Sequence, residues 1–253
     1  MNIVTICKID EWIPTHLARF VYFARQAVKD VKIHVAIPTR GESEEVLAAV
    51  ARPLRAAGLN LRFIKQQDVA GRLLYFDMLR SAATELFGLD ECLYADPDID
   101  IVEDISDITQ YDGDLLWVPN PITISHLVPQ FKKLNLQPPY MEPGFMYMRS
   151  SFKKDFEKWL NDPAIDRGSF APGSVIWSAI SAGVGSPPIP QYYNVTGWAA
   201  DQLCTAKSIH FTGPFAKQWR PYISYEHQPC RRMIINPKPV EDGIPDLDYR
   251  RHL

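Results

Sequence analysis

The first half of the chain alternates between short apolar runs and longer segments in which apolar residues recur at helical spacing. The expected strands cover residues 2–7, 31–37 and 61–64, and the expected helices cover residues 15–28, 42–57 and 73–87. We expect Thr15 to cap the first of these helices. Strands that alternate with helices predict an α/β protein with a mostly parallel central sheet, of the Rossmann-like type, flanked by helices. In such sheets ligands bind beyond the carboxyl ends of the strands.

The second half of the chain is less regular and richer in loops. Its expected strands cover residues 115–118, 145–148 and 207–211, and its expected helices cover residues 124–134, 151–160 and 174–182. Residues 138–144 are expected to form a loop that leads into the strand 145–148. No internal repeat or low-complexity segment divides the sequence, so we expect one domain over residues 1–253.

Three carboxylates follow the apolar run 91–94 at alternating positions. Asp96, Asp98 and Asp100 are separated by Pro97 and Ile99. Alternate residues of an extended chain share a face, so the pattern predicts that all three carboxylates point the same way. Pro97 removes a ladder donor and disfavours a helical Asp96, which predicts a strand end or edge. Converging carboxylates repel one another unless a cation lies among them, so this stretch predicts a divalent-metal site.

Other interpretations of the carboxylates remain. An EF-hand calcium loop is excluded, because Ile101 and Asp107 stand where that loop needs Gly and Glu. A solvated acidic turn and a nuclease-type or phosphatase-type cluster stay open. His210 ends a short predicted strand, and Lys217 offers a positive charge for phosphate. An imidazole added to two carboxylates favours Mn²⁺ over Ca²⁺.

Composition narrows the class of protein. The hydrophobic content of 46% and the charged content of 23% are typical of a soluble globular protein. The net charge of −3 gives no general reason to expect a nucleic-acid partner, although the segment from Cys204 onward is mildly basic. We expect a cytoplasmic protein with no transmembrane segment. The four cysteines lack metal-site spacing, so we expect neither a zinc site nor a disulfide framework.

Three segments, in order, resemble motifs of the family 8 retaining glycosyltransferases. Residues 94–105 are similar to the Y-L-D-x-D-x-x-V-x-x-D-I stretch of that family. Residues 143–148 look like its N-x-G-x-x-x-I segment, and residues 209–219 look like its C-terminal I-H-[FY]-x-G-x-x-K-P-W box. The resemblance covers roughly residues 2–220. It implies a single-domain A-type glycosyltransferase fold, with a nucleotide-sugar-binding half at 1–118 and an acceptor-side half at 119–253.

The resemblance also implies a UDP-sugar donor, a bound Mn²⁺ (with Mg²⁺ as a second choice) and roles for individual residues. The implied metal ligands are Asp96, Asp98 and His210. The implied donor-binding residues are Asp10 at the uracil, Arg80 and Asp96 beside the donor, and Gly213 and Lys217 at the diphosphate. The implied activity is the transfer of a hexose from the UDP-sugar to an acceptor hydroxyl.

The sequence departs from the family pattern on the acceptor side. Family members commonly carry an Asp-Gln pair that opens a helix, whereas residues 171–177 contain no carboxylate. Glu142 or Pro143 replaces the Asn of the N-x-G segment. Asp100 and Glu142 are the candidate catalytic residues: Asp100 either accepts a proton or supports the site from beside it, and Glu142 faces the acceptor hydroxyl.

The acceptor and the oligomeric state are therefore not indicated by the sequence. A glycan is the favoured acceptor, and DNA or protein stays open, since the C-terminal segment is basic and aromatic. Two rival functions remain, namely a metal-dependent phosphohydrolase and a non-catalytic nucleotide-sugar-binding protein.

Overall fold

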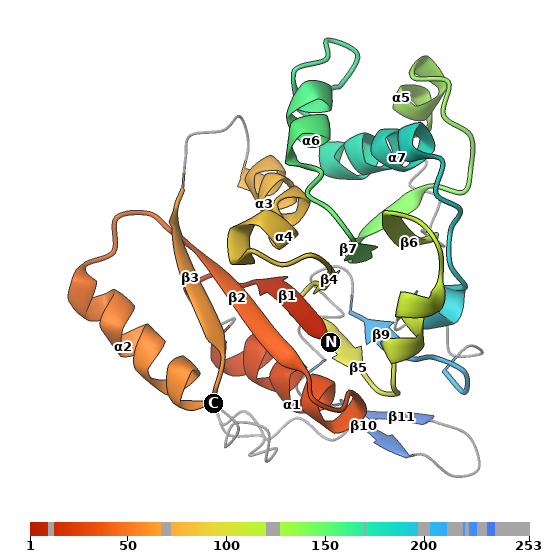
Figure 1. The fold of residues 1–253 in the computed structure, drawn as a ribbon. Helices are drawn as coiled ribbons and strands as arrows, with labels where there is room; N and C mark the ends of the chain where they lie inside the picture. Colours follow the sequence, from red (N-terminus) through yellow and green to blue (C-terminus); the bar gives the residue numbers. More distant parts are fainter. Residues whose placement is uncertain are drawn as a thin grey trace.

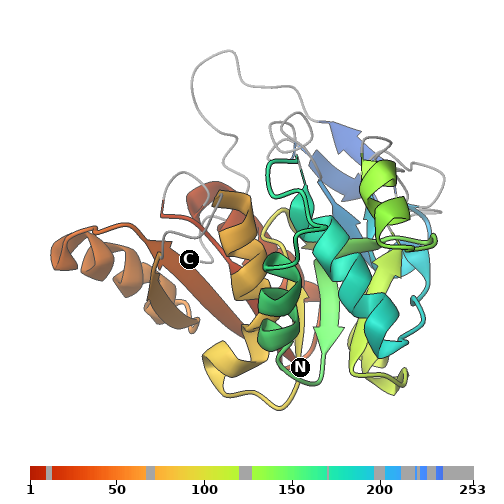
Figure 2. The same ribbon diagram turned by 90° about the horizontal axis from the view of Figure 1, so that it is seen from above.

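The structure is a computed structural model, shown in Figures 1 and 2. It describes residues 1–9, 13–66, 72–119, 127–169, 171–196, 203–211, 220, 223–226 and 232–235.

A six-stranded sheet forms the centre of the protein. Its strands, from one edge to the other, are β3 (Asn60–Lys65), β2 (Lys32–Thr39), β1 (Asn2–Ile6), β4 (Cys92–Ala95), β7 (Met141–Met148) and β6 (Leu115–Pro119). The pairs β3–β2, β2–β1 and β1–β4 are parallel, and β7 runs antiparallel to both β4 and β6. This confirms the expected α/β fold with a mostly parallel sheet.

Helices cover both faces of this sheet (Figures 1 and 2). The helices are α1 (Ala18–Ala27), α2 (Glu44–Ala56), α3 (Arg72–Ser81), α4 (Ala83–Phe87), α5 (Val128–Lys133), α6 (Lys153–Leu160) and α7 (Pro172–Val184). Buried side chains of α1 and α2 pack with alternate strand residues such as Ile33 and Leu93. Buried side chains of α3 to α7 pack with the intervening ones, such as Ala36 and Tyr94. The alternation follows from the two-residue period of a strand.

The chain beyond β4 enters a second, smaller sheet. It contains β5 (Ile99–Ile101), β9 (Ser208–His210) and β8 (Val195–Thr196), with β5 antiparallel and β8 parallel to β9. A hairpin of β10 (Ile223–Glu226) and β11 (Arg232–Ile235) lies next to α1, where Phe23 and Tyr225 make an edge-to-face contact. The short helical turns are η1 (Ile13–Leu17), η2 (Ser106–Gln110) and η4 (Gln191–Tyr193).

The carboxylate stretch is the place where the local prediction was wrong. Residues 91–102 do not form one extended strand, because β4 ends at Ala95 and β5 begins at Ile99. The amide of Ile99 donates to the carbonyl of Asp96 at 3.1 Å, which closes a turn around Pro97. The turn breaks the two-residue alternation, so Asp100 points away from the other two carboxylates.

Three further expectations need correction. The predicted helix 73–87 is two helices, which meet at Ala82. Part of the predicted loop 138–144 belongs to β7, whose pairing with β6 shifts register between Trp117 and Val118. Pro143, which lacks an N–H, lies in the shifted part of β7. Thr15 does not cap α1, since it lies inside η1 and the N-cap position is Leu17.

Cys204 is disulfide-bonded, contrary to the expectation from cysteine spacing. Cys7 and Cys92 are free and buried. None of the helices in the described ranges combines the length and apolar character that crossing a membrane requires.

A buried ionic cluster around Asp100 stabilises the turn at Pro97. The Asp100 carboxylate accepts hydrogen bonds from the guanidinium groups of Arg19 in α1 and of Arg220, and from the hydroxyl of Tyr225. Arg220 also donates to the carbonyls of Pro97 and Ile99. Asp100, Arg19 and Arg220 are at most 1% exposed. Burial alone would raise the pKa of Asp100, but the two arginine charges lower it below the ordinary value.

Replacement of Asp100 by alanine should destabilise the protein by about 3–5 kcal/mol, because it leaves two buried arginine charges uncompensated. Urea unfolding measures the difference. The matched control is Asp90→Ala, which changes an exposed aspartate and should stay within about 0.5 kcal/mol of wild type. Equal stability of the two variants would contradict a stabilising role for the cluster.

The difference in unfolding free energy between the wild type and Asp100→Ala should depend on pH. The folded-state pKa of Asp100 is lowered, so its charge stabilises the fold above the unfolded-state pKa of about 3.9 and stops doing so as the pH falls through the folded-state value. Unfolding curves of wild type and Asp100→Ala should therefore converge on acidification. A gap that stays constant from neutral to acidic pH would exclude an ionised Asp100.

Candidate metal and donor site

Asp96, Asp98 and His210 meet at the carboxyl end of β4. One potential ligand atom from each lies within 4.8 Å of the other two. His210 Nε2 is 3.4 Å from Asp98 Oδ1 and 4.0 Å from Asp96 Oδ2. Asp98 and His210 are buried, and the Asp96 side chain is 16% exposed. The structure thus brings together the three residues that the sequence suggested as metal ligands.

Backbone hydrogen bonds fix this meeting of segments that are distant in the sequence. His210 pairs with Ile99 in the β5–β9 ladder. The amide of Phe211 donates to the carbonyl of Asp98 at 3.1 Å, and the amide of Asp96 donates to the carbonyl of Gly144 at 2.8 Å. Each candidate ligand is therefore held by a strand or by the residue next to it.

Gly144 in β7 forms the floor of the cluster. A Cβ atom at this position would lie 2.4 Å from His210 Cε1, 3.0 Å from Asp96 Oδ2 and 3.2 Å from Glu142 Oε1. Contacts shorter than 3.0 Å do not occur for real Cβ atoms, so the close approach of these side chains requires glycine.

Glu142 joins the cluster as a third carboxylate. Burial raises its pKa above the ordinary value, against the opposing effect of His210. Burial would lower the pKa of His210, but the charges of Asp98, Glu142 and Asp96 together raise it. The site is a concentration of negative charge that an added cation would compensate.

Arg80 of α3 is the positive group beside the cluster. Its guanidinium donates to both oxygens of Asp96, at 2.8 and 2.9 Å, and to the hydroxyl of Tyr94 at 3.0 Å. A further nitrogen donates to Asp77 Oδ1 at 2.6 Å. Arg80 therefore orients a candidate metal ligand, and its side chain remains 17% exposed.

Asp77 is a buried carboxylate that the sequence did not single out. Its burial raises its pKa, and the charge of Arg80 lowers it in part. Asp77 lies against Gly173 at the start of α7, where a Cβ atom would be 1.9 Å from Asp77 Oδ2. A carboxylate from α3 thus occupies the space beside the helix in which the Asp-Gln pair of the motif is absent.

The surroundings of Asp100 favour a supporting role for this residue over a role as proton acceptor. Both of its oxygens accept hydrogen bonds from Arg19, Arg220 or Tyr225, and the residue is 0% exposed. A carboxylate with a lowered pKa and this set of donors is a poor proton acceptor. Asp100 supports the turn that carries Asp98.

Asn194 was also missed by the sequence. It is 1% exposed, and its Nδ2 atom lies 3.4 Å from His210 Nδ1. No motif marked it, because it reaches the site only through the pairing of β8 with β9. Asp10, Gly213 and Lys217, which the sequence assigned to the donor, lie outside the described residues.

The donor set fits a divalent cation. Two carboxylates and one imidazole are ligands suited to Mn²⁺, and their atoms are near enough for one ion to bind to all three. Gly144 leaves room for the side chains of Asp96 and His210, with Glu142 beside them.

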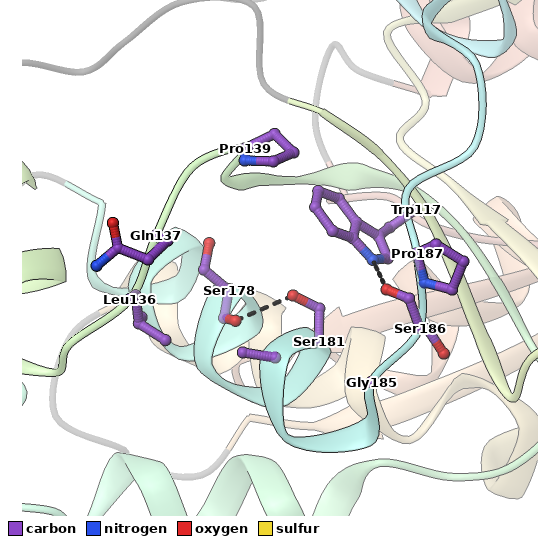
Figure 3. Close-up of a pocket in the computed structure, with 10 residues that line it drawn as sticks. Trp117, Leu136, Gln137, Pro139, Ser178, Ser181, Gly185, Ser186 and Pro187 are labelled. Atoms are coloured by element: carbon purple, nitrogen blue, oxygen red, sulfur yellow. Dashed lines mark hydrogen bonds between the residues drawn. The ribbon is translucent and has the colours of Figure 1, made fainter.

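A separate cavity of about 220 Å³ lies against α7 and β6 (Figure 3). The indole of Trp117 donates to the carbonyl of Ser186 at 3.0 Å, and the Ser181 hydroxyl donates to the carbonyl of Ser178 at 3.0 Å. The lining contains none of the cluster residues, so this cavity is distinct from the metal site.

Comparison with solved structures identifies the fold. The galactosyltransferase LgtC, bound to donor and acceptor sugar analogues, superposes with a TM-score of 0.64 at 17% identity and covers 91% of each chain. Mouse xyloside xylosyltransferase 1 has a TM-score of 0.54 at 10% identity and covers 83% of this chain and 97% of its own. GlyE of Streptococcus pneumoniae has a TM-score of 0.57 at 12% identity and covers 87% of this chain and 55% of its own.

The chain therefore has a glycosyltransferase fold of the A type, as the resemblance implied. No family model and no curated protein matches the sequence.

The substitution Gly144→Ala should destabilise the protein by about 1–3 kcal/mol and displace His210, because the new methyl group collides with its ring. Thermal unfolding and manganese titration measure the two effects. Gly183→Ala in α7 is the matched control, since its Cβ meets nothing within 4 Å and the helix should gain stability. Unchanged manganese affinity in Gly144→Ala would show that the cluster does not bind the ion.

Proposed function

We propose that this protein is a metal-dependent retaining glycosyltransferase that moves a hexose from a UDP-sugar to an acceptor hydroxyl. The observation that carries the proposal is the cluster of Asp96, Asp98 and His210. It lies at a strand end in a chain with a glycosyltransferase fold. The solved structures with this fold include one bound to donor and acceptor sugar analogues, which supports sugar transfer as the activity.

The chain supplies the ligands and the groups around them. Asp96 and Asp98 offer carboxylate oxygens and His210 offers an imidazole nitrogen to Mn²⁺ or, as a second choice, Mg²⁺. Bound there, the cation would stabilise the negative charge of the departing diphosphate. Arg80 holds Asp96 in position and keeps a positive charge beside the donor.

The donor makes further contacts with residues proposed from the motifs. Gly213 allows a close approach of the diphosphate, Lys217 offers it a positive charge, and Asp10 faces the uracil. Glu142 accepts a hydrogen bond from the acceptor hydroxyl, since its carboxylate lies with Asp96 and His210 around Gly144.

The transfer then requires no protein nucleophile. The bond between the anomeric carbon and the diphosphate oxygen breaks, and the acceptor oxygen bonds to that carbon from the same face. The acceptor proton leaves on the diphosphate. A glycan hydroxyl is the favoured acceptor, because the net charge gives no support to a nucleic acid.

The likeness to solved glycosyltransferases does not favour a binding protein that has lost transfer, which was the rival from another class. That rival is motivated by residues 171–177, which carry no carboxylate. Slow metal-dependent hydrolysis of UDP-sugars by the wild type would count against it. A phosphohydrolase is not favoured, because the glycosyltransferase fold gives it no support.

The substitution Asp98→Ala should abolish manganese-dependent binding of UDP, because it removes the most buried carboxylate of the cluster. Thermal shift with UDP and Mn²⁺ measures this, since a ligand at 100 times its Kd stabilises a protein by about 2.7 kcal/mol. The control Asp90→Ala removes an exposed aspartate and should bind as the wild type does.

Unchanged UDP affinity in Asp98→Ala, with Mn²⁺ present, would overturn the site assignment. A screen of nucleotide sugars under the same conditions would name the donor.

A further inference from the structure

We propose that the Asn194 amide oxygen accepts a hydrogen bond from His210 Nδ1–H and so stabilises the tautomer in which Nε2 can bind the cation. The inference rests on the proposed metal site. Asn194 lies at the end of η4, next to β8, and is 1% exposed. Its amide faces His210 Nδ1, on the opposite side of the ring from Asp98.

The two ring nitrogens of His210 face different neighbours. Nε2 is directed to Asp98 Oδ1 at 3.4 Å and to Asp96 Oδ2 at 4.0 Å. Nδ1 lies 3.4 Å from Asn194 Nδ2. A metal-binding imidazole is neutral and offers a lone pair, so a bound cation requires a lone pair at Nε2 and a proton at Nδ1.

A protonated Nδ1 needs an acceptor. In the structure, Asn194 turns its amide nitrogen to the ring, and its Oδ1 atom is buried with no hydrogen-bond partner among the described residues. A rotation of the amide by 180° exchanges the two atoms, which have nearly the same shape. The rotated amide accepts from Nδ1–H, satisfies Oδ1 and leaves the Nε2 lone pair for the cation.

The amide therefore has two settings that match two states of the ring. With Nδ2 toward the ring, Nδ1 accepts and Nε2 carries the proton that faces Asp98. With Oδ1 toward the ring, Nδ1 carries the proton and Nε2 is a ligand. Such a partner of a metal-binding histidine fixes the ring orientation and its tautomer. Asn194 is a positioning residue for His210.

Two variants separate this role from a structural one. Asn194→Leu keeps the size of the side chain and removes the acceptor, and it should weaken manganese binding by about 10–100-fold. Asn194→Asp keeps an acceptor at the same place, and it should bind manganese at least as tightly as the wild type. Isothermal titration with MnCl₂ alone measures the affinities, and Asn161→Leu, at an exposed asparagine, is the control.

Thermal unfolding without metal gives the second readout. Leucine removes a buried oxygen that has no partner within the part of the chain that the structure describes, but it also removes the partner of His210 Nδ1, so Asn194→Leu should destabilise the metal-free protein by no more than about 1–3 kcal/mol. Long-range ¹H–¹⁵N spectra with Mg²⁺ bound should show the His210 proton on Nδ1. Affinity unchanged in Asn194→Leu, equal losses in both variants, or a proton on Nε2 in the loaded protein would overturn the inference.

The manganese titrations also distinguish failure of the proposed metal site from failure of the proposed role of Asn194. A wild type that binds no manganese, or an Asp98→Ala variant that binds it normally, refutes the metal site itself. A wild type that binds through Asp98, with Asn194→Leu unaffected, refutes only the role of Asn194.

Discussion

The ionic cluster around Asp100 is the constraint on which the site depends. The Asp100 carboxylate forms ion pairs with Arg19 of α1 and with Arg220, which lies about 120 residues further along the chain. The second arginine also holds the carbonyls on both sides of Asp98. Because buried charges must be paired, the three segments cannot separate without a large cost. The turn that presents Asp98 is therefore fixed by electrostatics as much as by packing.

The opposite side of the turn is built from small or polar groups. Gly144 allows a carboxylate and an imidazole to approach the strand, and Arg80 holds Asp96 from α3. Each candidate ligand thus has one neighbour that sets its direction: Arg80 for Asp96, the Arg220-bound turn for Asp98, and Asn194 for His210. Rigid neighbours of this kind lower the cost of assembling a metal site.

Sequence patterns predicted the architecture well, because apolar periodicity reports which side of each element is buried. They also predicted the three candidate ligands, whose spacing carries the motif resemblance. They were wrong about the direction in which Asp100 points, because alternation assumes a continuous strand and the turn at Pro97 breaks it. Asp77 and Asn194 were out of reach, since their partners lie on other elements and local spacing holds no trace of those contacts.

The contact between Asp77 and Gly173 has a consequence for how this protein can change. A side chain at position 173 and a carboxylate at position 77 compete for the same volume, so a residue larger than glycine at 173 requires the Asp77 side chain to move or to be smaller. An acidic residue at position 173 would fit only if the residue at position 77 were smaller than aspartate or turned away from α7. In this protein the space beside the start of α7 is filled by an acidic side chain that comes from α3.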